Sequence, residues 1–458
     1  MNHDSKSLAS WPLPERLRWL RAFRRALATN QKALCDAMSA DMGKPHFEGL
    51  VGELMPLLEA CRWLERSAAR LLRPRGVSGG TMLQAGTRLS LCREPLGDVA
   101  IIATWNYPIQ LLGIQLIQAL VAGNRVWVKP SERSPGSQTL LLKLAQSPEP
   151  GVQLPSGVLN VAPATREAGA ELLSSRRFDH VVFTGSTSVG VQIARQLAPS
   201  LTPSTLELSG RDSALLLDDA DANLAASVLW TAVVLNAGQT CMAPKRVLVL
   251  PNAYAAFVQA LAPLAAGARP LTLVDEHAAE TCFEQARQAM TQGGRSLSGV
   301  CEPPQPDASG KRRLLRPLVI VDCPSHAPLV AGNNFGPVLP VVPVRSLDEA
   351  LAIHATHGQN LATSIFTRDV AKARELAPRL RSNFVAINDS FMPSAHPNMG
   401  LTGLGPSGMG TTRGELGLLS MTRPVYVART RGPMRPTAFQ PPDGVVRLLK
   451  RWMHWRHA

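Results

Sequence analysis

The fold class of this chain is indicated most clearly by residues 99–130, VAIIATWNYPIQLLGIQLIQALVAGNRVWVKP. It begins with a short apolar run at 99–103 and continues through an apolar segment long enough for a helix. It closes with RVWVK at 125–129, a second predicted strand whose three central residues are apolar. Short, fully apolar runs are typical of parallel strands that are buried on both faces. A helix that joins two such strands forms a crossover, so the stretch predicts a βαβ unit.

The same alternation of strands and helices continues along the chain. Apolar runs at 157–162 and 180–185 are each followed by a segment with helical spacing. A second series of strands is predicted between residues 208 and 390, at RVLVLP, LVIVD, PVLPVVPV, TSIFT and FVAIND. This pattern indicates an α/β protein with two doubly wound sheets. Helices at 14–72 and strands at TRLSLCREPLG and PVYVAR complete the predicted architecture.

Composition and charge narrow the classes of protein to consider. The 458 residues are 45% hydrophobic and carry a formal net charge of +14. Residues 429–458 hold seven Lys and Arg against one acid, Asp443, whereas the centre of the chain has ordinary charge mixing. Because the excess charge gathers toward the ends, we expect no nucleic-acid partner.

The seven cysteines are scattered and never form a C-x-x-C pair, which indicates neither a disulfide framework nor a zinc site. No run resembles a secretion signal, and none approaches 18 uncharged apolar residues. We therefore expect a cytoplasmic protein that uses no metal. His354 and His357 are expected on the solvated face of a surface helix.

Two loops that follow predicted strands could hold a ligand. At HVVFTGSTSVG (180–190), free backbone N–H groups and a helix N-terminus suit an anion such as a phosphate, although an ordinary turn would look the same. At VWVKPSERSP (126–135), Lys129, Ser131 and Glu132 lie at the carboxyl end of a strand, where parallel sheets bind ligands. The alternative for this second loop is a solvated turn with a helix cap.

Three further residues could carry covalent chemistry. Cys241 lies among small residues in LNAGQTCMAPKR (235–246), and a thiolate attacks carbonyl carbon well. Glu207, between two leucines in TLELSG, could serve as a general base, and Asn106 in WNYP could stabilise an oxyanion. The residues alone leave other interpretations open: a core cysteine, a solvent-facing carboxylate and a turn.

Taken together and in this order, the motifs resemble the NAD(P)-dependent aldehyde dehydrogenase superfamily over nearly the whole chain. The matching stretches are EPLGDVAIIATWNYP, AGNRVWVKPSE, LPSGVLNV, FTGSTSVG, TLELSG, NAGQTC, FGPVLPVV and GLGPSGMG. The short N-terminal segment and the ATWNYP and LTPSTLEL wording are most similar to the class 3 group of dimeric enzymes for fatty, aromatic and coniferyl aldehydes.

The resemblance implies a domain organisation. Residues 1–85 and 98–207 would form a dinucleotide-binding domain and residues 208–390 a catalytic domain. Residues 86–97 and 391–430 would form a small β element for oligomerisation or bridging, followed by a basic amphipathic tail at 431–458. A homodimer is implied, and the tail could make peripheral contact with the inner face of a membrane; the alternatives are a helix at the dimer interface and a disordered end.

The resemblance also implies roles for individual residues. Cys241 would be the nucleophile, Asn106 and the backbone N–H of Cys241 would hold the oxyanion, and Glu207 would activate the water that hydrolyses the thioester. The implied binding residues for NAD or NADP are Lys129, Ser131, Glu132, Gly185, Ser186, Thr104, Trp105, Leu208, Asn333 and Phe335. Glu132 would favour the free 2′-hydroxyl of NAD without excluding NADP.

Departures from the family motifs lie around the expected nicotinamide position. Asn333 replaces the glutamate of the E-I-F-G-P motif, and Ser209 replaces a glycine of E-L-G-G-K. The P-F-G-G-x-G loop has become LTGLG at 401–405. The main prediction is oxidation of a hydrophobic aldehyde to its acid. The alternatives are a coenzyme-A- or thiol-linked acylating or reductive enzyme, and a weakly active or non-catalytic membrane-associated homologue.

Overall fold

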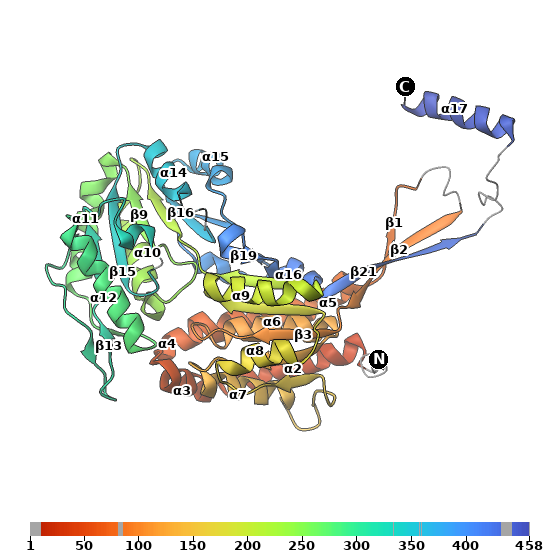
Figure 1. Cartoon of the computed structure of the whole chain (residues 1–458), viewed down its shortest axis with the longest axis horizontal. Coiled ribbons are helices and arrows are strands. Elements are labelled where there is room, and N and C mark those ends of the chain that lie inside the picture. Colours follow the sequence, from red (N-terminus) through yellow and green to blue (C-terminus); the bar gives the residue numbers. More distant parts are fainter. Residues whose placement is uncertain are drawn as a thin grey trace. The chain divides into compact units, whose positions relative to one another are not determined.

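The computed structural model describes residues 11–80, 86–332, 334–356, 358, 360–431 and 442–457. The chain divides into two compact units, one formed by Met1–Leu71 and Pro95–Arg423 and the other by Leu72–Glu94 and Pro424–Ala458. Both large sheets belong to the first unit, which is coloured from red to blue in Figure 1. The boundary expected near residue 208 between a dinucleotide-binding and a catalytic domain stays a prediction.

A six-stranded sheet confirms the crossover predicted from residues 99–130. Its strands are parallel except for the short β19, which pairs antiparallel with β7. Every residue of β3 is buried, as its uninterrupted apolar sequence requires. The order of the sheet is β19 (Gly408–Met409), β7 (Ser204–Leu208), β6 (His180–Gly185), β3 (Asp98–Ile102), β4 (Arg125–Lys129) and β5 (Leu159–Val161).

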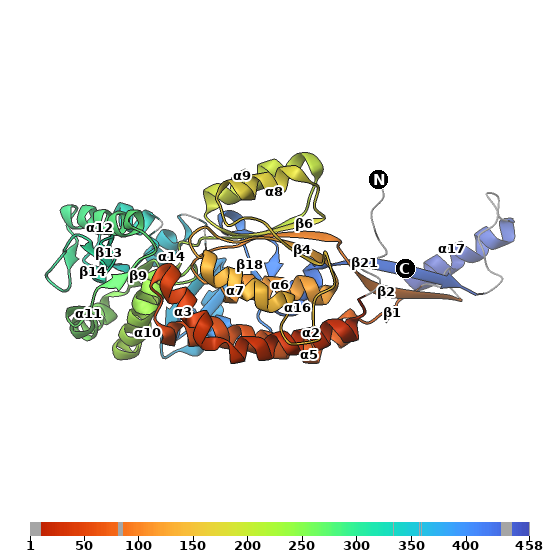
Figure 2. The same ribbon diagram turned by 90° about the horizontal axis from the view of Figure 1, so that it is seen from below.

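Helices cover both faces of this sheet (Figure 2). Helices α8 (Glu167–Ser175) and α9 (Thr187–Leu197) lie on one face, and α6 (Gln110–Ala122) and α7 (Pro135–Gln146) lie on the other. All thirteen residues of α6 are buried, because the helix also packs against the N-terminal helices. Ten of its thirteen residues are apolar or glycine, and a helix with so little polar surface is typically buried.

The N-terminal helices form the layer beyond α6 and α7. The first two of these helices contact α6 or α7 and each other, and the short third one contacts the second. Trp19 and Phe23 stack in the resulting core, with ring centroids 5.4 Å apart. The two or three helices expected over residues 14–72 are therefore confirmed. The elements are α2 (Leu13–Thr29), α3 (Gln31–Met42), α4 (His46–Glu48), the π-helical turn η1 (Gly49–Leu54) and α5 (Met55–Leu72).

A seven-stranded sheet forms the second large layer and confirms the second α/β region. All of its pairings are parallel except that of the edge strand β11. The order is β11 (Arg295–Ser296), β14 (Leu318–Val321), β15 (Val338–Pro343), β9 (Arg246–Val249), β8 (Ser213–Leu216), β16 (Ala362–Phe366) and β17 (Phe384–Ile387). Two separate apolar cores lie on its two faces. One contains α10 (Ala222–Val234) and α11 (Pro251–Ala266); the other contains α12 (Glu276–Thr291), α14 (Leu347–Ala355) and α15 (Val370–Leu376).

Short elements connect these layers within the first unit. They include two small antiparallel sheets, β10–β13–β12 and β18–β20, and several single turns. Their bounds are β10 (Leu271–Thr272), β12 (Gln305–Pro306), β13 (Arg312–Leu315), β18 (Leu401–Thr402), β20 (Thr411–Thr412), α13 (Pro328–Ala331), α16 (Gly414–Ser420), η3 (Ala198–Ser200), η4 (Leu235–Gly238), η5 (Ala377–Leu380), η6 (Met392–Ala395) and η7 (Gly405–Ser407).

The second unit contains a three-stranded sheet and the C-terminal helix. The sheet has the order β1 (Arg75–Val77), β2 (Thr87–Pro95) and β21 (Thr422–Thr430), and the helix is α17 (Asp443–His457). The strands expected at TRLSLCREPLG and PVYVAR are confirmed as β2 and β21. Among the described residues, no helix has the length and apolar character that crossing a membrane would require.

Candidate active site

Cys241 follows a loop that three consecutive left-handed residues bend sharply. Asn236, Ala237 and Gly238, in η4 at the end of α10, have φ angles of 53°, 51° and 68°. A Cβ atom at Gly238 would lie 2.3 Å from the backbone oxygen of Gly336. Only glycine fits such a close backbone approach at positive φ, so Gly238 fixes the path by which the chain reaches Cys241.

The Cys241 thiol is half-buried at the wall of a mainly apolar hollow. Burial raises the pKa of the thiol to about 11; the carboxylate of Glu207 raises it as well, while the cations of Arg413 and Lys245 oppose both effects. Because the thiolate is the nucleophilic form, a base must accept the proton when the sulfur attacks. The lining consists of Val51, Gly52, Pro56, Tyr107, Gln110, Leu111, Leu235, Thr240, Cys241, Met242, Phe391, Met392, Ser394, Ala395 and Arg413.

Glu207 is a buried carboxylate on β7 that accepts hydrogen bonds from three side chains. Its Oε2 accepts from Gln115 Nε2 at 3.2 Å and from Thr184 Oγ1 at 3.0 Å. Its Oε1 accepts from the Thr412 hydroxyl. The interpretation of Glu207 as a solvent-facing strand residue is therefore wrong, since only 4% of the residue is exposed. Three donors hold the carboxylate in one orientation, near enough to Cys241 to act on its thiol electrostatically.

Asn106 lies against the loop that carries Cys241. Its Nδ2 donates to the backbone oxygen of Gln239 at 3.1 Å, and its Oδ1 accepts from Thr104 Oγ1 at 3.1 Å. Asn236 Nδ2 donates to the backbone oxygen of Asn106 at 2.9 Å, which ties the two segments together a second time. A primary amide carries two N–H groups. One therefore remains for the oxyanion that would form on a carbonyl oxygen when the Cys241 sulfur attacks the carbonyl carbon.

A buried ion pair beneath Asn106 was not predicted from the sequence. Lys44 and Glu53 pair at almost complete burial, and Lys44 Nζ also donates to the backbone oxygen of Asn106 at 2.9 Å. Glu53 Oε2 accepts from the backbone N–H groups of Ile109 and Gln110, which begin helix α6. The pair thus holds the WNYP turn in place. The residues that support Glu207 were missed as well; three glutamines on the otherwise apolar α6 were the signal that could have indicated one of them, Gln115.

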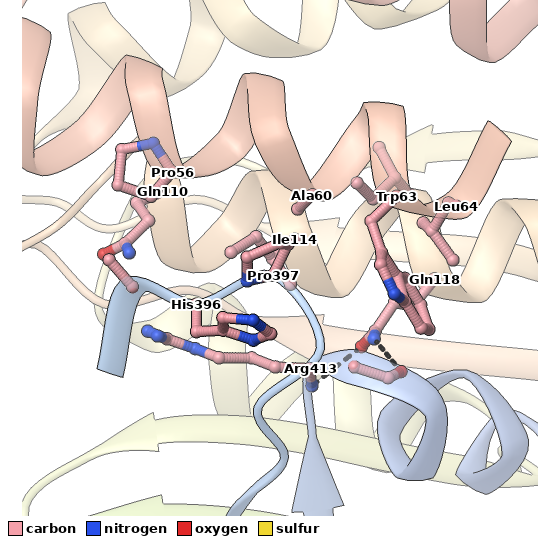
Figure 3. Close-up of a pocket in the computed structure, with 13 residues that line it drawn as sticks. Pro56, Ala60, Trp63, Leu64, Gln110, Ile114, Gln118, His396, Pro397 and Arg413 are labelled. Carbon is pink, nitrogen blue, oxygen red and sulfur yellow. Dashed lines mark hydrogen bonds between the residues drawn. The ribbon is translucent and has the colours of Figure 1, made fainter. Parts of the chain in front are cut away.

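A second, smaller hollow adjoins the one at Cys241 (Figure 3). Pro56, Gln110, Ala395 and Arg413 line both. In Figure 3 the Arg413 guanidinium lies on the side of Pro56 and Gln110, and Trp63 lies toward the opposite end. The backbone of Arg413 donates to Gln118 Oε1 at 3.1 Å. The side chains of Gln110 and Arg413 are therefore the two polar side chains that both hollows share.

The structure brings most of the predicted cofactor-binding residues to one cleft of about 1390 Å³. Lys129 Nζ lies 2.8 Å from Glu132 Oε2, and this bond holds the pKa of Glu132 below its usual value although partial burial acts to raise it. Ser186 caps α9, accepting from the backbone N–H of Val189 at 3.4 Å. The cleft is lined in part by Thr104, Trp105, Lys129, Ser131, Glu132, Gly185 and Ser186.

This donor and acceptor set fits a dinucleotide. The Lys129 and Glu132 side chains present a cation and a carboxylate, which suit ribose hydroxyls. The N-terminus of the eleven-residue α9 offers backbone N–H groups and a positive dipole end, which suit a pyrophosphate.

Two described residues among the predicted cofactor contacts, Phe335 and Leu208, do not line that cleft. Phe335 packs edge-to-face on Trp105, with ring centroids 5.8 Å apart, and Lys245 Nζ lies 4.9 Å from the Phe335 ring centre. Leu208 is buried at the end of β7. Asn333 lies outside the residues that the structure describes, so the expected loss of a nicotinamide-ribose contact stays a prediction.

One expectation from the sequence is wrong. His354 does not lie on a solvated helix face: only 2% of it is exposed, and its ring nitrogens contact Ser213 Oγ at 3.1 Å and the Leu380 backbone oxygen at 2.8 Å. The helix turns this position toward the sheet, where strand and loop partners remote in sequence satisfy the imidazole. His357 lies outside the described residues. In the described part of the chain, no group of His, Cys, Asp and Glu side chains could hold a metal ion.

Comparisons with known proteins identify the family. The model of the aldehyde dehydrogenase family matches residues 2–427, so the chain belongs to this family of enzymes, as its motifs predict. A probable coniferyl aldehyde dehydrogenase of Pseudomonas aeruginosa is 32% identical over 422 residues, covering 90% of this chain and 86% of that protein. The dimeric, NADP-preferring aldehyde dehydrogenase of Canis lupus familiaris is 28% identical, covering 88% and 87%.

Solved structures agree with this assignment. The Mycobacterium tuberculosis aldehyde dehydrogenase, crystallised with NAD⁺, superimposes with a TM-score of 0.84 at 27% identity, covering 95% of this chain and 88% of that one. The similarity to the class 3 and coniferyl aldehyde dehydrogenase group is confirmed by the curated relatives, which include family 3 members at 31% identity.

Proposed function

We propose that this enzyme uses NAD or NADP to oxidise a hydrophobic aldehyde to its carboxylic acid, with Cys241 as the nucleophile. The observation that carries the proposal is the half-buried Cys241 thiol at the wall of an apolar hollow, with the Glu207 carboxylate near it. The mainly apolar lining of this hollow suits an aliphatic or aromatic aldehyde.

The reaction begins when the Cys241 thiol gives its proton to solvent water and the thiolate sulfur attacks the aldehyde carbon, which forms a thiohemiacetal with a negatively charged oxygen. The oxyanion is stabilised by Asn106 and by the backbone N–H of Cys241, which lowers the barrier to attack. A bound nicotinamide cofactor supplies the hydride acceptor that turns the adduct into a thioester. Glu207 then takes a proton from a water molecule, which hydrolyses the thioester and frees the sulfur.

The dinucleotide would bind along the cleft that contains Lys129 and Glu132. Glu132 accepts hydrogen bonds from a free 2′-hydroxyl and repels a 2′-phosphate, so NAD is the better fit. The partial exposure of the Glu132 side chain, 43%, allows it to turn aside, so NADP is also accepted. Ser131 and Ser186 would contribute hydroxyls, and Trp105 with Phe335 an aromatic wall beside the nicotinamide.

A substrate panel tests the proposal. Straight-chain and aromatic aldehydes are assayed by absorbance at the nicotinamide band with NAD and with NADP, using wild type, Cys241→Ala and the control Cys301→Ala. Cys301 is also half-buried but lines neither the hollow nor the cleft. We expect activity in wild type and the control and none in Cys241→Ala. Absence of cofactor reduction with every aldehyde would refute the proposal. Formation of an acyl-thioester product with coenzyme A would instead favour an acylating enzyme, a function that the presence of a Glu207 base argues against.

We also infer that the protein is a cytoplasmic homodimer whose C-terminal helix contacts an anionic membrane surface. Helix α17 has no buried residue, and Leu448, Met453 and Trp455 are 62%, 57% and 78% exposed. Arg447, Lys450, Arg451 and Arg456 alternate with these apolar residues, a pattern that suits an interface with anionic lipid. The dimer is supported by the relative described as dimeric.

Vesicle flotation and light scattering test these two inferences. Full-length protein should bind vesicles of anionic phospholipid, and a chain truncated at Pro441 should not. A variant with Lys450→Glu and Arg451→Glu should lose binding without losing the helix. Unchanged binding after truncation would refute the membrane contact. A solution mass near 49.2 kDa, that of one chain, would refute the dimer.

A further inference from the structure

Arg413 is the one charged side chain that lines the hollow at Cys241 in the described part of the chain. It is only 9% exposed, and its Nη1 donates to the backbone oxygen of Ser394 at 3.3 Å. A backbone oxygen is a neutral acceptor. Within the described residues, no carboxylate lies within ion-pair distance of Arg413, and no Asp or Glu lines either adjoining hollow. A cation held in an apolar enclosure without a counter-charge is costly, which calls for an anion that arrives from outside the chain.

The backbone at Arg413 is held in an unfavourable conformation that places this cation. Its φ of 65° and ψ of 161° fall in a region that only glycine adopts without strain. The preceding residue, Thr412, donates to Glu207, and the following one, Gly414, begins α16. Gln118 accepts the Arg413 N–H and so fixes the strained turn. Such strain persists where the surrounding structure imposes it, and it is typical of ligand-binding positions.

The position of the guanidinium relative to the sulfur defines what it can bind. Arg413 and Cys241 line the same hollow, and Arg413 also lines the smaller hollow beyond it, together with Gln110, Gln118 and His396. The walls of the hollow that Cys241 and Arg413 share are mainly apolar, and they include Leu111, Phe391 and Met392. A substrate that reaches both groups has an aldehyde at one end, an apolar body and an anionic group at the other end.

We propose that Arg413 is a specificity-determining residue that binds the carboxylate of an aldehyde substrate, so that the preferred substrates are apolar aldehydes with a carboxylate at the far end. This inference rests on the proposed function, since it names the substrate class of the same site. A guanidinium binds a carboxylate through two parallel hydrogen bonds, and Gln110 provides a further amide beside it. The carboxylate would compensate the buried cation and orient the aldehyde toward Cys241.

Matched pairs of substrates test the inference. The acids 4-oxobutanoate, 6-oxohexanoate and 8-oxooctanoate are compared with their methyl esters, which have nearly the same shape and no charge, and with hexanal. For the acid of best length, wild type should show a kcat/KM about 10- to 100-fold above that of its ester, the range expected for a charge-assisted contact. Arg413→Met should remove this preference, so that the acid-to-ester ratio of kcat/KM falls to near one; oxidation of the ester should fall as well, because the Arg413 cation also lowers the pKa of the Cys241 thiol.

The control variant is Arg374→Met, which removes an exposed arginine on α15 that lines neither hollow. It should keep the wild-type preference, and Arg413→Lys should keep part of it because the charge remains without the fork. A wild-type acid-to-ester ratio near one at every length would overturn the inference even if no variant folds. An acid-to-ester ratio that Arg413→Met leaves at the wild-type value would overturn it too, because Arg413 would then act on the Cys241 thiol alone. Failure of the proposed function is distinct: no aldehyde, hexanal included, would then reduce the cofactor.

Discussion

Replacing Glu207 by glutamine tests the role of the buried carboxylate with little change in shape. In the wild type, both carboxylate oxygens accept hydrogen bonds, from Gln115, Thr184 and Thr412. A glutamine would turn one oxygen into an NH₂ group that faces at least one donor. A buried donor left without an acceptor costs about 1 to 3 kcal/mol, so the variant should unfold at a lower temperature than wild type but still fold.

The expected kinetic effect lies in hydrolysis of the thioester. A positioned general base contributes roughly 10²- to 10⁴-fold, so steady-state turnover should fall by that factor. Attack by Cys241 and transfer of hydride need no activated water, so the first turnover should remain comparatively fast. Glu207→Gln should therefore give a burst of reduced cofactor close to one equivalent per active site, followed by a slow steady rate.

Rapid mixing with a saturating aldehyde and absorbance detection of the reduced cofactor measures the burst and the steady rate together. The matched control is Glu65→Gln, which removes a carboxylate that pairs with Arg24 on the N-terminal helices and lines none of the cavities described above. The control should keep wild-type turnover. A steady rate in Glu207→Gln within about threefold of wild type would refute the role of Glu207 as the base. A folded variant that shows no burst would place its function before hydride transfer instead.

Three further predictions follow from the geometry. The rate at which iodoacetamide alkylates Cys241, measured as the difference between wild type and Cys241→Ala, should rise about tenfold per pH unit from pH 7 to 9. The reason is that a pKa raised to about 11 keeps the thiolate fraction rising over that range. A plateau of the rate near pH 8 would contradict this. Gly238→Ala should lower the free energy of unfolding by about 1 to 3 kcal/mol or more, as measured by urea denaturation, because its Cβ would overlap the Gly336 carbonyl; unchanged stability would contradict the close approach. Glu132→Gln should raise affinity for NADP relative to NAD by about tenfold in calorimetric titrations, because an acid that repels a 2′-phosphate is removed; an unchanged ratio would show that Glu132 does not face the 2′ position.

The strands, crossovers and nucleophile could be predicted because each is encoded in a short stretch of sequence. The central residues of β3 and β4 are uninterrupted apolar stretches, and the small residues before Cys241 are contiguous with it. Sequence alone left Glu207 open between a solvent-facing residue and a base, because its burial depends on Thr412, 205 residues further along the chain.

The features that the sequence did not predict are contacts between remote segments. His354 is satisfied by Ser213 and Leu380, 141 and 26 residues away, so its helix looked like a surface helix when its neighbours alone were considered. Arg413 follows a Gly-rich loop that carries no sign of a cavity, and only the fold places its cation in the hollow at Cys241. Such positions depend on which loops the two sheets bring together.

In the proposed reaction Cys241 carries the acyl group of the substrate, and peptide mass mapping measures this directly. Glu207→Gln is mixed with hexanal and NAD, quenched in acid within one turnover and digested. If Cys241 is the nucleophile, we expect a hexanoyl group on the peptide that contains Cys241, in an amount that matches the burst of reduced cofactor. A burst that leaves the Cys241 peptide unmodified, or that places the acyl group on another residue, would contradict it.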